Sequence, residues 1–217
     1  VARNGLVRLN SDGSVDTSFN TTIDGNVFAL ALQTDGHLIV GGNFTTGGNF
    51  TTGGDSSGSG VAQNLVRLNA DGGVDATFQY QGNRQINDLM IQPDGKVLAA
   101  EGDATNTRGE SSYRLIRLNI DGSEDSSFVT VFNFAVRAIA LQSDGKIIAG
   151  SGFSMANGQT RHRIARFDTE GNLDASYDPD ADTQIKALTV QDDGKLLAGG
   201  DFLNVGGQPR LRIARLN

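Results

Sequence analysis

Five residues, Leu-Val-Arg-Leu-Asn, stand at positions 6–10 and return four more times, with small changes, along the 217-residue chain. Successive arginines are 59, 50, 49 and 49 residues apart, at Arg8, Arg67, Arg117, Arg166 and Arg215. Two other landmarks keep this period: an Asp-Gly pair at residues 35, 94, 144 and 193, and an aromatic residue at Phe19, Phe78, Phe128 and Tyr177. A unit of about 50 residues cannot bury its own apolar faces, so we expect neighbouring units to cover one another.

Each unit has the pattern of a short β-sheet. The Asp-Gly pair lies between two apolar runs, which predicts a hairpin in which glycine takes the positive φ of a tight turn. The first arms are residues 27–32, 86–91, 136–141 and 185–190, and both of their faces are apolar. This pattern indicates burial on both sides of the sheet. The arginine segment predicts a third strand, and the segment that ends at the aromatic residue predicts a fourth strand at the outer edge.

These observations predict an all-β protein, a β-propeller built from four four-stranded blades of about 50 residues, alone or as part of a larger ring. We expect one domain over residues 1–217, with units at about 6–64, 65–114, 115–163 and 164–212, and with 213–217 starting or completing a further blade. The arginine segment occurs five times and the hairpin four times. Either the first and last segments share a blade and close a ring, or the chain is part of a longer array, which is the interpretation we favour.

Composition excludes several kinds of protein and site. The chain has 25 acidic and 18 basic residues, a formal charge of −7, which disfavours binding to nucleic acid. It has no apolar run long enough to span a bilayer, so we expect no membrane insertion. The absence of cysteine excludes disulfides, thiolate zinc sites and cysteine nucleophiles. The 29 glycines suit a protein with many tight turns.

The combined pattern Leu-Val-Arg-Leu-Asn-x-Asp-Gly-x-x-Asp-x-(Ser/Thr)-Phe, followed by Leu-x-Leu-Gln-x-Asp-Gly-Lys and a Gly-Gly pair, resembles the bacterial delta-60 repeat. That family is also described as a β-propeller domain of unknown function. The chain departs from the pattern at Glu170, at Ala100-Glu101 and at His37. The resemblance implies a large secreted or cell-surface bacterial protein, and it offers no catalytic residues to transfer.

A calcium site is one interpretation of the turn that contains Asn10, Asp12 and Asp16, because hard cations bind several closely spaced oxygens. However, Arg8 fills the first ligand position, and a guanidinium there repels Ca²⁺. We favour a structural role in which each arginine pairs with the aspartate that follows it in the turn. These aspartates are Asp16, Asp75, Asp125 and Asp174.

The sequence does not predict an enzyme or a cofactor. His37 and His162 are the only histidines, and neither stands in the spacing of a catalytic triad or a metal site. Most carboxylates belong to the repeated turns. Glycan hydrolysis by a pair of carboxylates stays open as an alternative, and Glu110 and Asp182 are examples of carboxylates outside the repeated turns.

Ligand binding is expected where the units differ from one another. The variable connections are residues 43–63, 101–112, 152–163 and 201–210, which all follow the same strand. They carry the candidate ligand residues Arg108, Arg161, Arg163 and Arg210. We expect a non-catalytic binding, adhesion or assembly module of a secreted or cell-surface bacterial protein, whose partner is a protein, a glycan, or a neighbouring domain or chain. A purely structural spacer in a larger fibre or array is the alternative.

Overall fold

The computed structural model describes residues 5–45, 63–102 and 113–217, and this part of the chain contains strands and turns but no helix. It therefore contains no helix long enough to cross a membrane. The main elements are four antiparallel sheets of three strands each. The first two are formed by β1 (Asp24–Leu32), β2 (Leu38–Thr45) and β3 (Gln63–Leu68), and by β4 (Ile86–Ile91), β5 (Val97–Glu101) and β6 (Leu115–Leu118).

The third and fourth sheets are formed by β7 (Val136–Leu141), β8 (Ile147–Ser151) and β11 (Ile164–Phe167), and by β12 (Ile185–Val190), β13 (Leu196–Gly200) and β16 (Ile213–Leu216). Each has a small hairpin between its second and third strands. These are β9 (Met155–Ala156) with β10 (Gln159–Thr160), and β14 (Asn204–Val205) with β15 (Gln208–Pro209). The all-β prediction and the hairpin at every Asp-Gly pair are confirmed.

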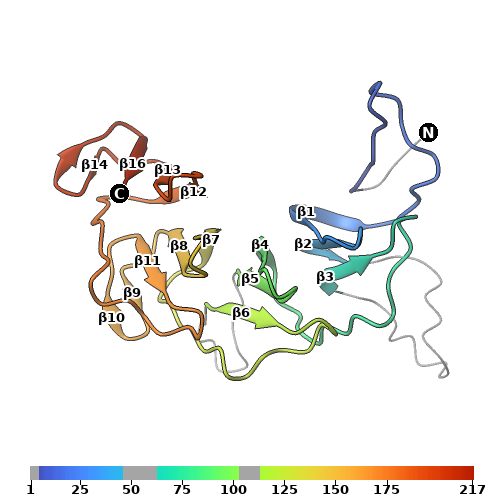
Figure 1. Ribbon diagram of the computed structural model, residues 1–217, viewed down its shortest axis with the longest axis horizontal. Coiled ribbons are helices and arrows are strands. Elements are labelled where there is room, and N and C mark those ends of the chain that lie inside the picture. The colour runs from blue at the N-terminus through green and yellow to red at the C-terminus, as the bar shows by residue number, and fades with distance from the viewer. Residues whose placement is uncertain (1–4, 46–62, 103–112) are drawn as a thin grey trace.

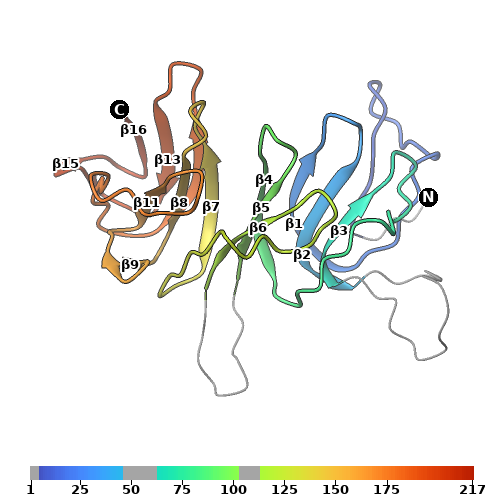
Figure 2. The same cartoon turned by 60° about the horizontal axis from the view of Figure 1, so that its bottom comes forward.

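The four sheets stand side by side along an open arc (Figure 1). Their first strands, β1, β4, β7 and β12, contact one another in sequence order along the inner side of the arc. The third strands β3, β6 and β11 lie farther out, and the turned view shows the sheets stacked face to face (Figure 2).

The predicted fourth strand is wrong, because the four main sheets described here contain three strands each. After each third strand the chain makes a single isolated bridge, for example Leu68 to Val74. It then turns away, because the Asp75 carboxylate accepts hydrogen bonds from the backbone amide and the hydroxyl of Thr77. The side-chain acceptor replaces a ladder partner and bends the chain towards the next sheet.

The structure does not place the first and last arginine segments in one sheet. β16 is the third strand of the fourth sheet, where it pairs with β13. Residues 6–10 lie at the opposite end of the arc, where Arg8 donates to the carbonyl oxygen of Ala70 at 2.6 Å.

The core lies between the sheets. Ile39 and Leu65 of the first sheet pack against Ile86 and Leu89 of the second, and the same arrangement joins the later sheets. Burial of one such aliphatic side chain contributes about 1.5–3 kcal/mol. Small residues on one sheet meet large residues on the next: a Cβ added at Gly41 would lie 2.7 Å from Cγ2 of Ile86.

Candidate functional site

Each of the first four repeated arginines is held by an aspartate and an aromatic ring of the turn that follows it. The nitrogen–oxygen distances to the aspartates are 2.8, 2.7, 2.9 and 2.7 Å for Arg8, Arg67, Arg117 and Arg166. Each guanidinium also lies 4.1–4.9 Å from the centroid of the aromatic ring three residues after its aspartate. Cation–π contact and ion pairing therefore fix one arginine conformation in each unit.

The same arginines connect neighbouring units. Arg8 donates to the carbonyl of Ala70, Arg67 to that of Ile120 at 2.8 Å, and Arg117 to that of Thr169. The three acceptors occupy the same position of the repeat. Arg166 bonds only to Asp174 within the described residues, so three of the four arginines make this contact, and its recurrence between successive units identifies these residues as part of the scaffold.

The turn aspartates stay ionised well below neutral pH. Hydrogen bonds from Ser18 and from Arg8 lower the pKa of Asp16 from 3.8 to about 2. Ser176 and Arg166 do the same for the pKa of Asp174, also to about 2. For Asp125 the hydrogen bond from Lys96 makes the largest contribution to a lowered pKa.

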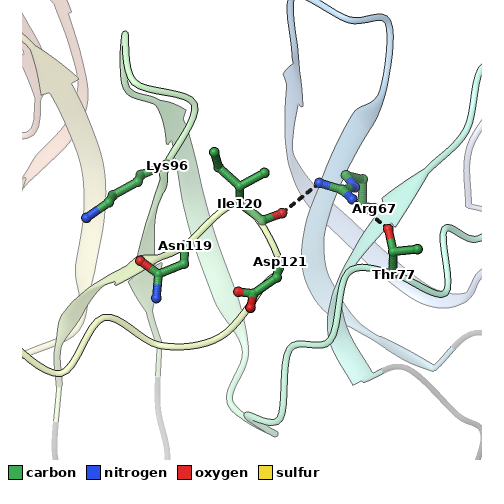
Figure 3. Close-up of a pocket in the computed structure, with 6 residues that line it drawn as sticks. All are labelled: Arg67, Thr77, Lys96, Asn119, Ile120 and Asp121. Atoms are coloured by element: carbon green, nitrogen blue, oxygen red, sulfur yellow. Dashed lines mark hydrogen bonds between the residues drawn. The ribbon is translucent and has the colours of Figure 1, made fainter.

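Figure 3 shows a pocket of about 510 Å³ between the first and second sheets. Arg67 points into it from the first sheet and donates to Ile120 and to Thr77 Oγ1 at 3.0 Å. The remaining lining residues are Lys96 of the second unit and Asn119, Ile120 and Asp121 of the third, and Lys96, Asn119 and Asp121 stand at recurring positions of the repeat pattern. Because the polar residues that line this pocket recur in the repeat, the contact between neighbouring units explains the pocket, and no ligand is needed to explain it.

The side chains considered for calcium form local turn contacts. Asp12 accepts the amide and the hydroxyl of Ser14, to which Asn10 also donates. Asp16 accepts from Ser18 and Arg8. Among residues 5–45, 63–102 and 113–217, no group of three or more His, Cys, Asp or Glu side chains is placed to hold a metal ion.

The candidate ligand arginines of the variable connections have different surroundings. Arg161 is buried and donates to two backbone carbonyls, those of Thr160 and Asp174. Arg163, two residues away, has φ 71° and donates to a third carbonyl. Arg210 is exposed beyond β15 and donates to the carbonyl of Pro209. Arg108 lies outside the described residues.

The non-repeated carboxylates also differ in their surroundings. Glu110 lies outside the described residues. Asp182 anchors a loop, because it accepts the side-chain amide of Asn204 and the backbone amides of Leu203 and Asn204. The bond from the Asn204 side chain contributes most to the lowered pKa of Asp182. Glu101, which departs from the Gly-Gly pattern, is 1% exposed and lies 3.0 Å from Nε of Arg114.

A feature of the inner strands was not predicted. Each first strand contains a β-bulge at the same repeat position, where one extra residue has no partner in the ladder. The extra residues are Phe28, Asn87, Arg137 and Lys186. A bulge re-aims a side chain out of the regular alternation of the strand.

These four residues line one shared pocket of about 330 Å³, together with Gln85. Gln85 donates to Asn87 at 2.6 Å, and Asn87 in turn donates to the carbonyl of Val136 in the third sheet at 2.8 Å. Arg137 is exposed and has no hydrogen bond or ion pair within the described part of the chain. The Phe28 ring, the side-chain amides of Gln85 and Asn87 and the Arg137 guanidinium thus line the same pocket.

Charges at the rim complete the description of the pocket. Lys186 forms an ion pair of 2.7 Å with Asp201, and more than half of its side chain is exposed. The Asp88 carboxylate accepts the amide of Ile139, and burial raises its pKa. Asp88 therefore joins two sheets. Lys186 is paired with Asp201, so the positive charge that faces the pocket without an acidic partner among the described residues is that of Arg137.

Comparison with known proteins gives a family and a fold. The pattern of the "Domain of unknown function (DUF5122) beta-propeller" matches residues 1–19, 33–78, 92–128, 142–177 and 191–217, which is well over half of the chain. A comparison with curated proteins gives no significant match.

Two solved structures resemble the fold. One is PorZ, described as an essential surface component of the type-IX secretion system of Porphyromonas gingivalis, with a TM-score of 0.56 and 13% identity over 97% of this chain. The other is a streptogramin B lyase, with a TM-score of 0.51 and 11% identity over 88% of this chain. The chain spans 31% and 54% of these two proteins, respectively. At such identities the likeness extends to the fold alone, and the matched repeat pattern places the chain in the DUF5122 β-propeller family.

Proposed function

We propose that the chain is a non-catalytic binding module of a secreted or cell-surface bacterial protein, and that the four bulge residues bind an acidic glycan. One observation carries this proposal. The bulge recurs in all four inner strands, whereas its residue changes from Phe28 to Asn87, Arg137 and Lys186. The scaffold is kept constant and the chemistry of the surface differs, as expected for a ligand site on a repeat protein.

The residue types suit a carbohydrate that carries a carboxylate. The Phe28 ring is 48% exposed and offers an apolar face for a sugar ring. Gln85 and Asn87 offer amide donors and acceptors for hydroxyls. Arg137 offers two parallel N–H donors to a carboxylate, and such charge-assisted bonds are stronger than neutral ones.

We assign the ligand to the bulges rather than to the variable connections because Arg161 and Arg163 already donate to backbone carbonyls. Secretion or surface exposure is supported by the resemblance of the repeat to the bacterial delta-60 repeat. The chain as a whole has a charge of −7 and therefore repels large polyanions. A small acidic ligand can still be attracted by the positive charge at the pocket.

The test is binding of oligosaccharides that contain uronic or sialic acid, with their neutral counterparts alongside. We expect binding to the acidic sugars, and a loss of about tenfold for Arg137→Gln, equal to about 1.4 kcal/mol. Arg210→Gln, which changes an exposed arginine outside the pocket, is the matched control and leaves affinity unchanged. Loss on Arg210→Gln but not on Arg137→Gln would move the site to the loops. Absence of sugar binding favours the spacer, and release of cleaved sugar favours an enzyme.

A further inference from the structure

The residue that follows the second strand of a sheet lies beside the bulge residue of the first strand. In the fourth sheet this residue is Asp201, which comes directly after β13 and forms the ion pair of 2.7 Å with Lys186. In the second sheet it is Gly102, where an added Cβ would lie 3.0 and 3.2 Å from the side-chain amide atoms of Asn87. The backbone amides of Asp201 and Gly102 donate to carbonyls at the same repeat position, so the backbone fixes this place beside the bulge. The side chain that stands there decides what the bulge residue contacts.

A carboxylate at this place occurs in the fourth unit alone. The first unit has Asn43, and the second and third units have glycine. In the third unit, a Cβ added at Gly152 would lie 3.2 Å from the Phe134 ring, and Arg137 has no carboxylate beside it from this position. Of the two cations at bulge positions, one therefore has an acidic neighbour built into its own sheet, and the other has none there.

This difference sets the charge of the pocket. Arg137 and Lys186 are the charged residues among those that line it, and Asp201 cancels one of the two charges. The side chains of Lys186 and Asp201 are 54% and 44% exposed, so their pair lies at the rim, where it contributes little to stability but still acts on charges that approach. A ligand carboxylate near Arg137 meets an unpaired cation, whereas one near Lys186 meets the like charge of Asp201.

We propose that Asp201 is a specificity-determining residue, which makes the pocket select acidic glycans with one carboxylate over those with two. The inference rests on the proposed function, because it concerns the ligand of the same pocket. Arg137 binds the single carboxylate, and Asp201 is the repulsive element that discriminates against a second one.

Digalacturonic acid and its monomethyl ester test the proposal by titration calorimetry, because they share one skeleton and differ by one carboxylate. We expect the unaltered chain to bind the ester at least as tightly as the diacid. Asp201→Asn removes the repulsive charge and frees Lys186, so the affinity for the diacid rises about two- to fivefold relative to that for the ester, as expected for an exposed ion pair. Adding Lys186→Gln to this variant abolishes the gain. Both side chains are exposed, so the variants keep the fold, which circular dichroism confirms.

Asp192→Asn is the matched control. It changes the net charge by the same amount at an exposed carboxylate that does not line the pocket, so the ratio of the two affinities stays that of the unaltered chain. A preference of the unaltered chain for the diacid, an unchanged ratio in Asp201→Asn, or a gain that persists without Lys186 overturns the role of Asp201, while binding of the acidic sugars leaves the proposed function in place. Absence of binding to both sugars in every variant instead overturns the proposed function, and this inference with it.

Discussion

Replacing Gly150 with alanine measures how tightly the sheets pack. An added Cβ would lie 2.8 Å from Cγ2 and 3.2 Å from Cβ of Ile185, and 2.9 Å from Cδ1 of Leu188. The leucine methyl moves easily, but the isoleucine atoms are next to the backbone of a β-branched residue and move only with the strand. The two sheets must therefore separate, or the strand must shift.

The expected cost follows from two opposing contributions. Overpacking in a core costs about 1–3 kcal/mol. Removing a glycine stabilises by about 0.4–1 kcal/mol, because the unfolded chain loses conformational freedom. The net loss for Gly150→Ala is about 1–2 kcal/mol, which lowers the melting temperature of a chain of this size by about 2–8 °C.

Gly199→Ala is the matched control. It makes the same chemical change at the same repeat position, but no neighbouring sheet lies over it. Only the gain of about 0.4–1 kcal/mol remains, so the melting temperature rises by about 1–4 °C. Thermal unfolding followed by circular dichroism at low protein concentration separates the two variants. A Gly150→Ala protein as stable as the unaltered chain, or equal losses in both variants, would refute the argument from packing.

Two further predictions concern the charged groups. Glu101→Gln is expected to cost about 2 kcal/mol, because the buried Glu101 side chain loses the charge with which it accepts hydrogen bonds from half-buried Arg114. Urea unfolding measures this cost, and a change below the error of the method would contradict a structural role. Asp174→Asn is expected to lower the melting temperature at neutral pH, since its folded pKa of about 2 lies below the ordinary 3.8 and the carboxylate therefore stabilises the fold above that value. The difference from the unaltered chain should close as pH falls from 3.8 to about 2, and a difference that persists at lower pH would exclude the ionised Asp174–Arg166 pair as its cause.

The repeat landmarks predicted the scaffold well because each has a local physical cause. The Asp-Gly pairs lie in the hairpin turns, and glycines such as Gly36 and Gly95 have positive φ. The arginine and the aspartate of each turn lie at a fixed spacing, so their pairing follows from a single tight turn. The prediction of a fourth strand failed because Asp75 and its equivalents bend the chain after one bridge.

The pocket was missed for a different reason. A bulge has no characteristic composition, and residues 27–32 are apolar on both faces, so the sequence predicts a regular buried strand there. The signal that could have found it was variation: Phe28, Asn87, Arg137 and Lys186 stand at one position, and the residues on either side are apolar in all four units except for Asp88. The sequence instead predicted the ligand site at the variable connections, although Arg161 is buried there and donates to backbone carbonyls.

At the bulge position, the residue that the fold requires and the residue that the surface presents are chosen independently. Its residue takes no part in the ladder, and it does not belong to the hydrophobic clusters between the sheets. A substitution at Phe28 or Arg137 therefore changes the surface for which we propose ligand binding and removes no contact of the ladder, whereas one at Asn87 also removes its hydrogen bond to the third sheet. Because the repeat places one such position in every sheet, four substitutions that leave the strand ladders unchanged are enough to alter the chemistry of the whole inner surface.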